Sequence, residues 1–124
     1  MPAPVPAAAA RRTETPNGVM TTLASPTLGA ARELALWRVN MEEGATGPEH
    51  VFDSEQVWTI VAGAARVTVD GTEEPLAAGD TIVLPAGASR QVSADGPLEA
   101  LVAGRAGALV TAVGHDGVTP PWIA

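Results

Sequence analysis

Hydrophobic and polar positions alternate in short runs from about residue 20 onward, and Gly, Pro and Asp separate the runs. The alternation is clearest in residues 33–42, where Ala35, Trp37, Val39 and Met41 all fall on the same side of a two-residue period. Successive side chains of a β-strand point to opposite faces, so this pattern predicts a strand that buries one face. We therefore expect these four side chains to lie in the core.

Similar runs follow along the chain, and none shows the 3.6-residue stripe of an amphipathic helix. The dipeptide Asp70-Gly71 is a strong hairpin-turn signal between two of them. Short strands separated by Gly-rich turns are typical of a sandwich or barrel. The pattern predicts an all-β domain with strands at Glu33–Glu42, Val57–Val61, Ala65–Val69, Thr81–Leu84, Arg90–Ala94, Leu98–Ala103 and Ala108–Val113.

The two ends of the chain differ from this body. Residues 1–18 are rich in Pro and Ala and have no periodicity, which predicts a disordered extension ahead of one domain at residues 19–124. We expect no catalytic residue before Met20. At the other end, Pro120–Ile123 is apolar and extended, and we expect it to dock against the barrel or a neighbouring subunit.

Charge and composition narrow the classes of partner. The net charge is −7, with seven Arg and no Lys, so the chain lacks the basic surface that binds nucleic acid or anionic lipid. It has no Cys, which excludes disulfides and thiolate chemistry. No apolar run approaches the ~20 residues of a membrane span. We expect a soluble, cytoplasmic protein with a small-molecule partner and neither a nucleic-acid nor a membrane partner.

Two segments together carry a family resemblance. The first is residues 44–63, Gly-Ala-Thr-Gly-Pro-Glu-His-Val-Phe-Asp-Ser-Glu-Gln-Val-Trp-Thr-Ile-Val-Ala-Gly, and the second is residues 79–90, Gly-Asp-Thr-Ile-Val-Leu-Pro-Ala-Gly-Ala-Ser-Arg. They resemble the two motifs of the cupin superfamily, and the resemblance covers roughly residues 30–113. It implies a single-domain jelly-roll barrel or sandwich, and a homodimer in which Val19–Leu28 is the candidate arm.

The resemblance also bears on metal binding. Metal-binding cupins place His, His and Glu in the first motif and a third His in the second, and the matching positions here are His50, Phe52, Gln56 and Arg90. A phenyl ring has no donor atom, and a guanidinium repels a cation. One imidazole and one amide are too few ligands for Zn²⁺ or Fe²⁺. We expect no metal and no cofactor; the alternative is a weak metal site at His50, as in a cupin dioxygenase or isomerase.

Strand parity then predicts a site inside the barrel. Positions 50, 52, 56 and 58 share one parity and point inward in a jelly roll, where residue 90 joins them from the second motif. This composition predicts an apolar cup that holds three hydrogen-bonding groups. The predicted site residues are the catalytic His50, Gln56 and Arg90 and the substrate-binding Phe52, Trp58, Trp37 and Met41.

The two strongest candidates each have a structural alternative. His50 is either a buried neutral imidazole that bonds a backbone carbonyl, or a general acid or base. Arg90 needs a partner in an apolar interior. That partner is either a carboxylate of the domain, such as Glu99 or Asp95, or an anionic group of a ligand.

The remaining candidates also have two interpretations. Gln56 is either a hydrogen-bonded core amide or a group that orients a ligand. Trp37, Trp58 and Met41 are either plain core or part of the binding surface.

The hypothesis that joins these observations is a metal-independent cupin that acts on a small apolar molecule by acid–base chemistry. The reaction classes are isomerisation, cyclisation and dehydration, as in biosynthetic cupins. In this hypothesis His50 is the acid or base, Arg90 stabilises developing negative charge and Gln56 orients the substrate. The alternative is a small-molecule-binding cupin without turnover.

Overall fold

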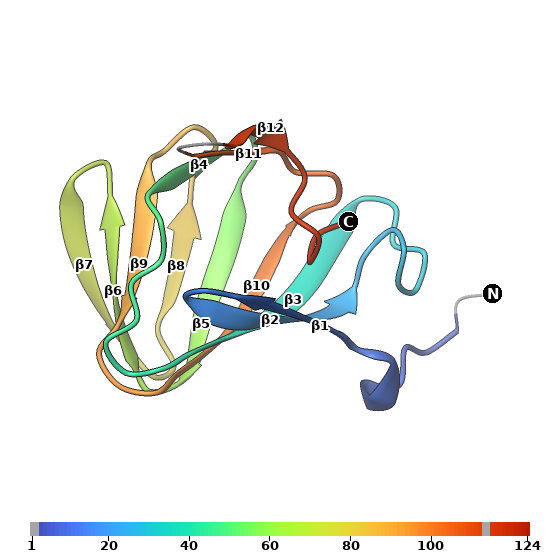
Figure 1. Ribbon diagram of the computed structural model, residues 1–124, viewed down its shortest axis with the longest axis horizontal. Helices are drawn as coiled ribbons and strands as arrows, with labels where there is room; N and C mark the ends of the chain where they lie inside the picture. Colours follow the sequence, from blue (N-terminus) through green and yellow to red (C-terminus); the bar gives the residue numbers. More distant parts are fainter. Residues whose placement is uncertain (1–2, 113–114) are drawn as a thin grey trace.

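The computed structural model describes residues 3–112 and 115–124, which form two six-stranded antiparallel sheets packed face to face (Figure 1). A short 3₁₀ turn, η1 (Ala7–Ala9), precedes them. The first sheet runs β1 (Arg11–Thr15), β2 (Gly18–Ala24), β3 (Leu34–Met41), β10 (Leu98–Arg105), β5 (Gln56–Ala62) and β8 (Thr81–Leu84). The second sheet runs β12 (His115–Val118), β11 (Val110–Ala112), β4 (His50–Phe52), β9 (Arg90–Ala94), β6 (Ala64–Val69) and β7 (Thr72–Ala77).

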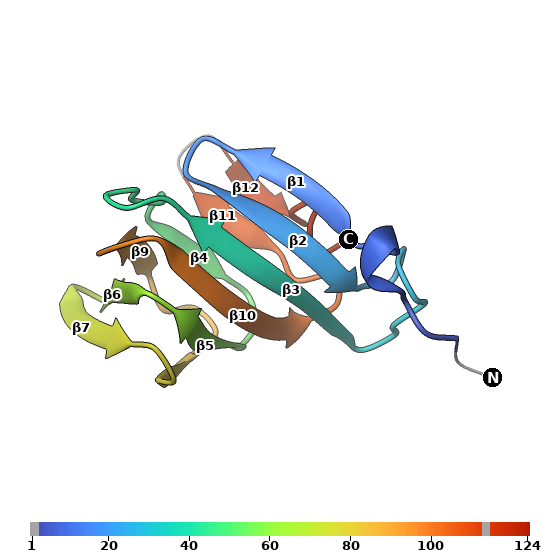
Figure 2. The same ribbon diagram turned by 90° about the horizontal axis from the view of Figure 1, so that it is seen from below.

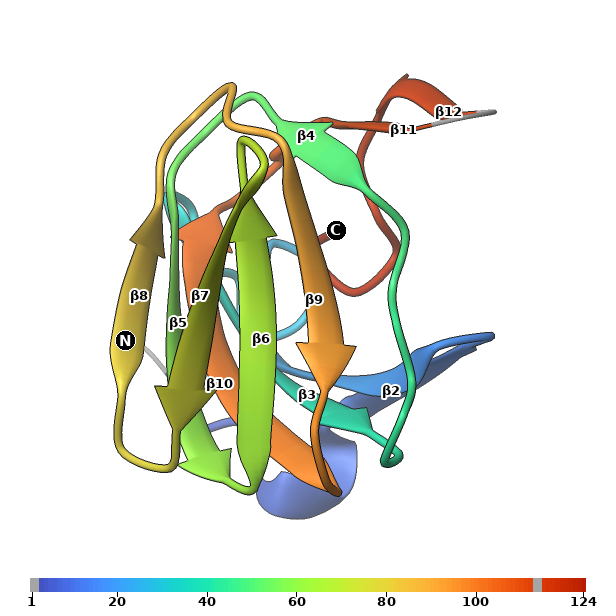
Figure 3. The ribbon, with the colours of Figure 1, turned by 90° about the vertical axis from the view of Figure 1, so that its left-hand side faces the viewer.

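The architecture is a nearly all-β jelly roll, which confirms the predicted fold class. Figure 3 shows β6, β7 and β9 as one layer over β5, β8 and β10. Figure 2 shows β1, β2, β3 and β10 as one layer in front of β4, β11 and β12. At this second end the layers are spread apart, and the C-terminal segment lies between them (Figure 1). Within the described residues, no helix is long and apolar enough to cross a membrane.

The core follows the predicted alternation. Ala35, Trp37, Val39 and Met41 on β3 are all buried, as expected, whereas Leu34 is two-thirds exposed. β3 lies between β2 and β10, and its buried face points into the space between the two sheets. The two-residue period therefore determines which side chains reach the interior.

The predicted hairpin turn is present. Asp70 and Gly71 have φ values of 47° and 83°, and β6 pairs with β7 from Val69–Thr72 onward. Two positive φ values in a two-residue loop are the geometry of a type I′ turn, which favours Asp-Gly. Asp70 also accepts a hydrogen bond through Oδ1 from the backbone nitrogen of Ser89 at 2.9 Å. The turn is thereby tied to the start of β9.

Disorder throughout residues 1–18 was the wrong expectation. Arg11–Thr15 form β1, which pairs with β2 at five successive positions, from Arg11–Thr22 to Thr15–Gly18. The strand is polar and lies at the edge of the sheet, where β2 pairs with the backbone groups on one side. This pairing does not need apolar side chains. Residues 19–22, part of the candidate dimer arm, are likewise paired within the chain on both sides, with β1 and with β3. The homodimer itself stays a prediction.

The C-terminal segment docks within the chain. Ile123 is completely buried, and the main-chain oxygen of Ala124 accepts hydrogen bonds from Arg11 Nη2 at 2.8 Å and from Ser25 Oγ at 2.6 Å. Thr22 Oγ1 donates to the Trp122 oxygen at 2.7 Å. β1 and β2 thus hold the last residues against the open end of the jelly roll.

Gly63, at the end of the first motif, combines a left-handed backbone with a close approach to another part of the chain. Its φ is +81°, and a Cβ there would lie 2.0 Å from the carbonyl oxygen of Pro97. Gly87 also has a positive φ, +79°, but a Cβ there meets nothing within 4 Å. Left-handed backbone alone costs about 1–2 kcal/mol in a residue with a Cβ. We expect Gly87→Ala to lower the free energy of unfolding by about that amount and Gly63→Ala by ~3 kcal/mol or more.

Urea unfolding followed by far-UV circular dichroism measures both variants. Gly87→Ala is the matched control, because it carries the backbone strain without the clash. Equal losses of stability in the two variants would contradict the close approach of Gly63 to Pro97.

Candidate functional site

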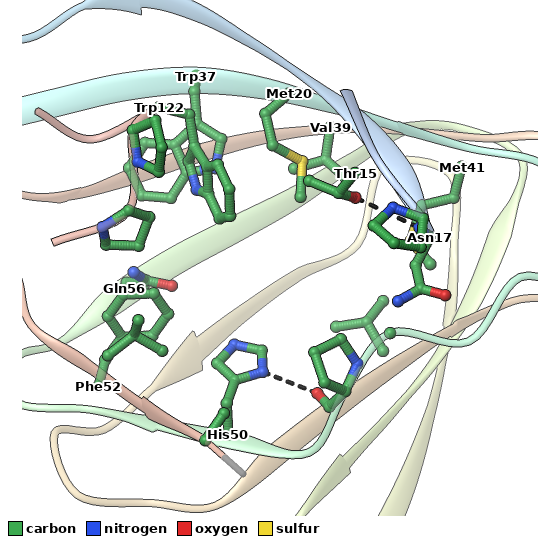
Figure 4. A pocket seen from close by; sticks show the side chains of 18 of the residues that line it. Thr15, Asn17, Met20, Trp37, Val39, Met41, His50, Phe52, Gln56 and Trp122 are labelled. Atoms are coloured by element: carbon green, nitrogen blue, oxygen red, sulfur yellow. Dashed lines mark hydrogen bonds between the residues drawn. The ribbon is translucent and has the colours of Figure 1, made fainter. Parts of the chain in front are cut away.

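A cavity of about 350 Å³ lies between the two sheets at the open end of the jelly roll (Figure 4). Its walls are mostly apolar, and its volume is within the range of small-molecule sites. Six of the seven predicted site residues line it. They are His50, Gln56, Phe52, Trp58, Trp37 and Met41.

His50 projects into the cavity from β4 with a defined tautomer. Its Nδ1 lies 2.8 Å from the carbonyl oxygen of Pro48 (Figure 4). A carbonyl oxygen only accepts, so Nδ1 donates the proton and the neutral ring keeps its lone pair on Nε2. Burial lowers the pKa of His50 below its ordinary value, and the positive charge of Arg90 adds to this, while the bond to Pro48 opposes it. The imidazole is therefore a neutral acceptor at pH 7.

Gln56 is the second polar group of the cavity wall. Its side chain is almost completely buried at the start of β5. Its Oε1 faces two N–H donors, Arg90 Nη1 at 3.4 Å and Trp58 Nε1 at 3.5 Å. These long contacts orient the amide, because two donors favour the oxygen at that position. Its Nε2 has no hydrogen-bond partner within residues 3–112 and 115–124.

Arg90 does not line the cavity, so the prediction that it projects into the lumen is wrong. Its guanidinium is buried behind Phe52, with Cζ 5.4 Å from the centre of that ring. Nη2 donates to the Pro85 oxygen at 3.0 Å and Nε to the Ala88 oxygen at 3.2 Å. The backbone carbonyls before β9 and Gln56 Oε1 thus attract the long side chain away from the lumen.

The carboxylates considered as partners for this cation are also engaged elsewhere. Asp95 accepts from Arg66 Nε at 2.9 and 2.8 Å, and Glu99 lies 3.9 Å from Arg38. Asp70 exerts the one attraction that raises the pKa of Arg90, while desolvation by burial lowers it more strongly. A guanidinium stays charged at any pH at which proteins fold. Arg90 is therefore a structural cation whose hydrogen bonds go to backbone and amide oxygens.

The four positions that match the cupin metal ligands come together, but their chemistry does not fit a metal. His50 and Arg90 are paired across β4 and β9, and the His50 and Phe52 rings meet edge to face with centroids 5.4 Å apart. Gln56 Oε1 already faces Arg90. The described residues contain no cluster of three His, Cys, Asp or Glu side chains suited to an ion. A fixed positive charge among these side chains disfavours a second cation.

Sequence reasoning missed part of the cavity wall. Thr15, Pro16, Asn17 and Met20, in and beside the β1–β2 hairpin, line it, and none of them is among the predicted site residues. The loop of this hairpin is Pro16-Asn17. The run Thr15-Pro16-Asn17-Gly18 has Pro and Gly where a type I turn favours them, a signal that would have revealed the turn. Trp122, for which only docking was predicted, also lines the cavity with its two preceding prolines.

Comparison with known proteins agrees with this architecture. The cupin domain family matches residues 37–104, more than half of the chain. No curated protein matches the sequence significantly. A jelly roll with these two motifs around a central cavity defines the structural class. The chain belongs to the cupin family.

Solved structures show the same fold at low identity. An RmlC-like cupin from Shewanella frigidimarina is 21% identical with a TM-score of 0.69, over 80% of this chain and 86% of the other. KdgF from Halomonas sp. is 19% identical with a TM-score of 0.73, over 85% of this chain and 94% of the other. Salicylate 1,2-dioxygenase from Pseudoaminobacter salicylatoxidans is 18% identical with a TM-score of 0.75, over 85% of this chain but 31% of that one.

The neutral state of His50 gives a prediction about pH. We expect the imidazole to titrate below its ordinary pKa of about 6.5. As the pH falls, His50 is therefore protonated at a higher pH in the unfolded chain than in the folded one. The contribution of His50 to the free energy of unfolding therefore decreases below pH 6.5 until the folded-state pKa is reached, by at most about 1.4 kcal/mol per pH unit. Above pH 6.5 both states are neutral and this contribution is constant.

NMR titration of the ring protons measures this pKa, and the spectrum of His50→Gln assigns the signal, since the chain has two histidines. The free energy of unfolding of the wild type relative to His50→Gln should decrease between pH 7 and pH 5.5. A pKa at or above 6.5 would show that the imidazole is not desolvated as described.

The poor fit of His50, Phe52, Gln56 and Arg90 to a metal ion gives a second prediction. We expect the purified protein, after dialysis against Mn²⁺, Fe²⁺ and Zn²⁺, to hold far less than one ion per chain by mass spectrometry. We also expect a chelator to leave its melting temperature unchanged, because metal bound to the folded state would stabilise it. Near-stoichiometric metal that is lost in the variant His50→Gln would contradict this interpretation.

Proposed function

We propose that this cupin binds a small, largely apolar molecule in the cavity and moves a proton on it with His50 as the base. The observation that carries the proposal is the hydrogen bond from His50 Nδ1 to the Pro48 oxygen, which leaves the lone pair of Nε2 for a ligand. A base with a pKa near the working pH and a fixed orientation is suited to proton transfer. The reaction classes remain isomerisation, cyclisation and dehydration.

The step can be written for a ketone with an acidic α-hydrogen. His50 Nε2 takes the proton, the C–H bond breaks, and its electron pair moves to the carbonyl oxygen to form an enolate. A hydrogen bond from the amide nitrogen of Gln56 would stabilise that oxygen. The imidazolium then returns the proton to another atom of the same molecule, which completes an isomerisation and restores the neutral base.

The proposed role of Arg90 is indirect. Its guanidinium is separated from the cavity by Phe52, so it makes no contact with developing charge. Its positive charge disfavours the protonated form of His50 when no anion is present. The same charge favours the negative charge of an enolate. Because its N–H groups also hold Gln56 Oε1, Arg90 is a positioning residue in this proposal.

A second candidate function is binding without turnover, because buried Arg90 does not line the cavity and cannot act on a ligand directly. Among the described residues that line the cavity, His50 is the one ionisable side chain, so no second acid or base assists it. A binding protein would show a raised melting temperature with a small ketone or phenol and no consumption of it.

Hydrogen exchange tests proton transfer without knowledge of the natural substrate. Phenylacetone in D₂O at neutral pD loses its α-hydrogen signal in the ¹H NMR spectrum as exchange proceeds. We expect the wild type to exceed the buffer rate and His50→Gln to lose about 10²-fold or more of that excess. The rate should fall below pH 6.5, as His50 becomes protonated.

The matched control is Thr81→Ala, which removes an exposed hydroxyl on β8 that bonds Thr59 away from the cavity. It should exchange at the wild-type rate. An equal rate in the His50→Gln variant would exclude His50 as the base. A wild-type rate no higher than buffer would favour binding without turnover.

A further inference from the structure

The walls of the cavity restrict the charge of its ligand. Twenty residues line it, and His50 is the ionisable one among them in the part of the chain that the structure describes. The nearest buried cation, Arg90, already donates to the oxygens of Pro85, Ala88 and Gln56. A carboxylate or ammonium group in this cavity would lose its hydration without gaining a counterion, which disfavours charged molecules strongly.

The polar groups of the wall are complementary to each other. His50 Nε2 is an acceptor, because Nδ1 carries the proton that bonds Pro48. Gln56 Nε2 is a donor, and no described residue satisfies it although the side chain is 2% exposed. Buried donors are nearly always satisfied, so an unpartnered one in a cavity wall points to a missing acceptor. The wall therefore offers one acceptor and one donor.

The two groups also lie at the same end of the cavity. Phe52 connects them: His50 meets its ring edge to face, and Arg90, which donates to Gln56 Oε1, lies over the same ring. Figure 4 shows His50, Phe52 and Gln56 near one another on one side of the cavity, with Trp37 and Trp122 on the other side. One small molecule can thus place its polar groups on His50 and Gln56 and its apolar part against the indoles.

We infer that the cavity selects uncharged molecules with an O–H group for His50 and a carbonyl oxygen for Gln56, that is, phenols or enols that also carry a ketone or aldehyde. This inference rests on the proposed function in using the same two side chains, and it adds the substrate class. It argues against one of the two partners that the sequence analysis gave for Arg90, an anionic group of a ligand, because that partner required Arg90 in the cavity. An O–H on His50 Nε2 also places an acidic proton on the proposed base.

Four ring compounds of similar size separate the elements of this inference. They are 4-hydroxyacetophenone, 4-methoxyacetophenone without the O–H, 4-ethylphenol without the carbonyl, and 4-hydroxybenzoate with a carboxylate. Isothermal titration at pH 7 gives their dissociation constants for the wild type. We expect 4-hydroxyacetophenone to bind best and the methoxy and ethyl compounds about tenfold more weakly, since one hydrogen bond contributes roughly that factor. We expect 4-hydroxybenzoate to bind more weakly still, because its carboxylate loses its hydration without gaining a counterion.

Two variants assign each preference to a side chain. In Gln56→Met, 4-hydroxyacetophenone and 4-ethylphenol should bind equally, whereas the methoxy compound should still bind more weakly. In His50→Phe, the methoxy and hydroxy ketones should bind equally. Such cycles isolate the pairwise contact from the general effect of the substitution. Thr81→Ala is again the control, and if a variant does not fold, the wild-type series alone decides.

Each other outcome overturns the inference. Equal affinity for all four compounds would make the cavity a non-selective apolar site, tighter binding of 4-hydroxybenzoate would show an accessible cation, and no binding by any compound would exclude the class. These outcomes are independent of the exchange experiment. Selective binding without exchange would refute proton transfer alone, and exchange without this selectivity would refute the substrate class alone.

Discussion

The buried guanidinium of Arg90 is the constraint on which the site depends. A buried cation must have hydrogen-bond partners, and here they are two loop carbonyls, the amide oxygen of Gln56 and the face of Phe52. This arrangement places a fixed positive charge among the positions where related cupins hold metal ligands. This charge adds to burial, which is the larger cause of the lowered pKa of His50, and the N–H groups of Arg90 orient the Gln56 amide. The chemistry of the cavity is therefore that of neutral hydrogen-bonding groups.

Much of the fold could be predicted from residue patterns. Alternation in β3 identified the buried face correctly, and the Asp70-Gly71 turn and the two glycine-containing motifs identified the family. Strand parity also brought His50, Phe52, Gln56 and Trp58 to one cavity, because a strand's period determines the direction of each Cα–Cβ bond. These predictions succeeded because each depends on local geometry.

The path of Arg90 could not be predicted in this way. Parity places its Cβ correctly on the inner face, but four further rotatable bonds direct the guanidinium, and their outcome depends on carbonyls at Pro85 and Ala88. The β1–β2 hairpin and Trp122 were missed as cavity walls for a related reason. Arg11 bonds the oxygens of Pro121 and Ala124, 110 and 113 residues away, and contacts at that separation leave no periodic signal.

The positions of the tryptophans have one more consequence. Trp37, Trp58 and Trp122 are the three tryptophans of the chain, there is no tyrosine, and all three line the cavity. The near-ultraviolet emission of the protein therefore originates entirely from the walls of this cavity. A molecule that enters displaces solvent from the indoles or stacks on them, so the protein carries its own label-free optical reporter of occupancy.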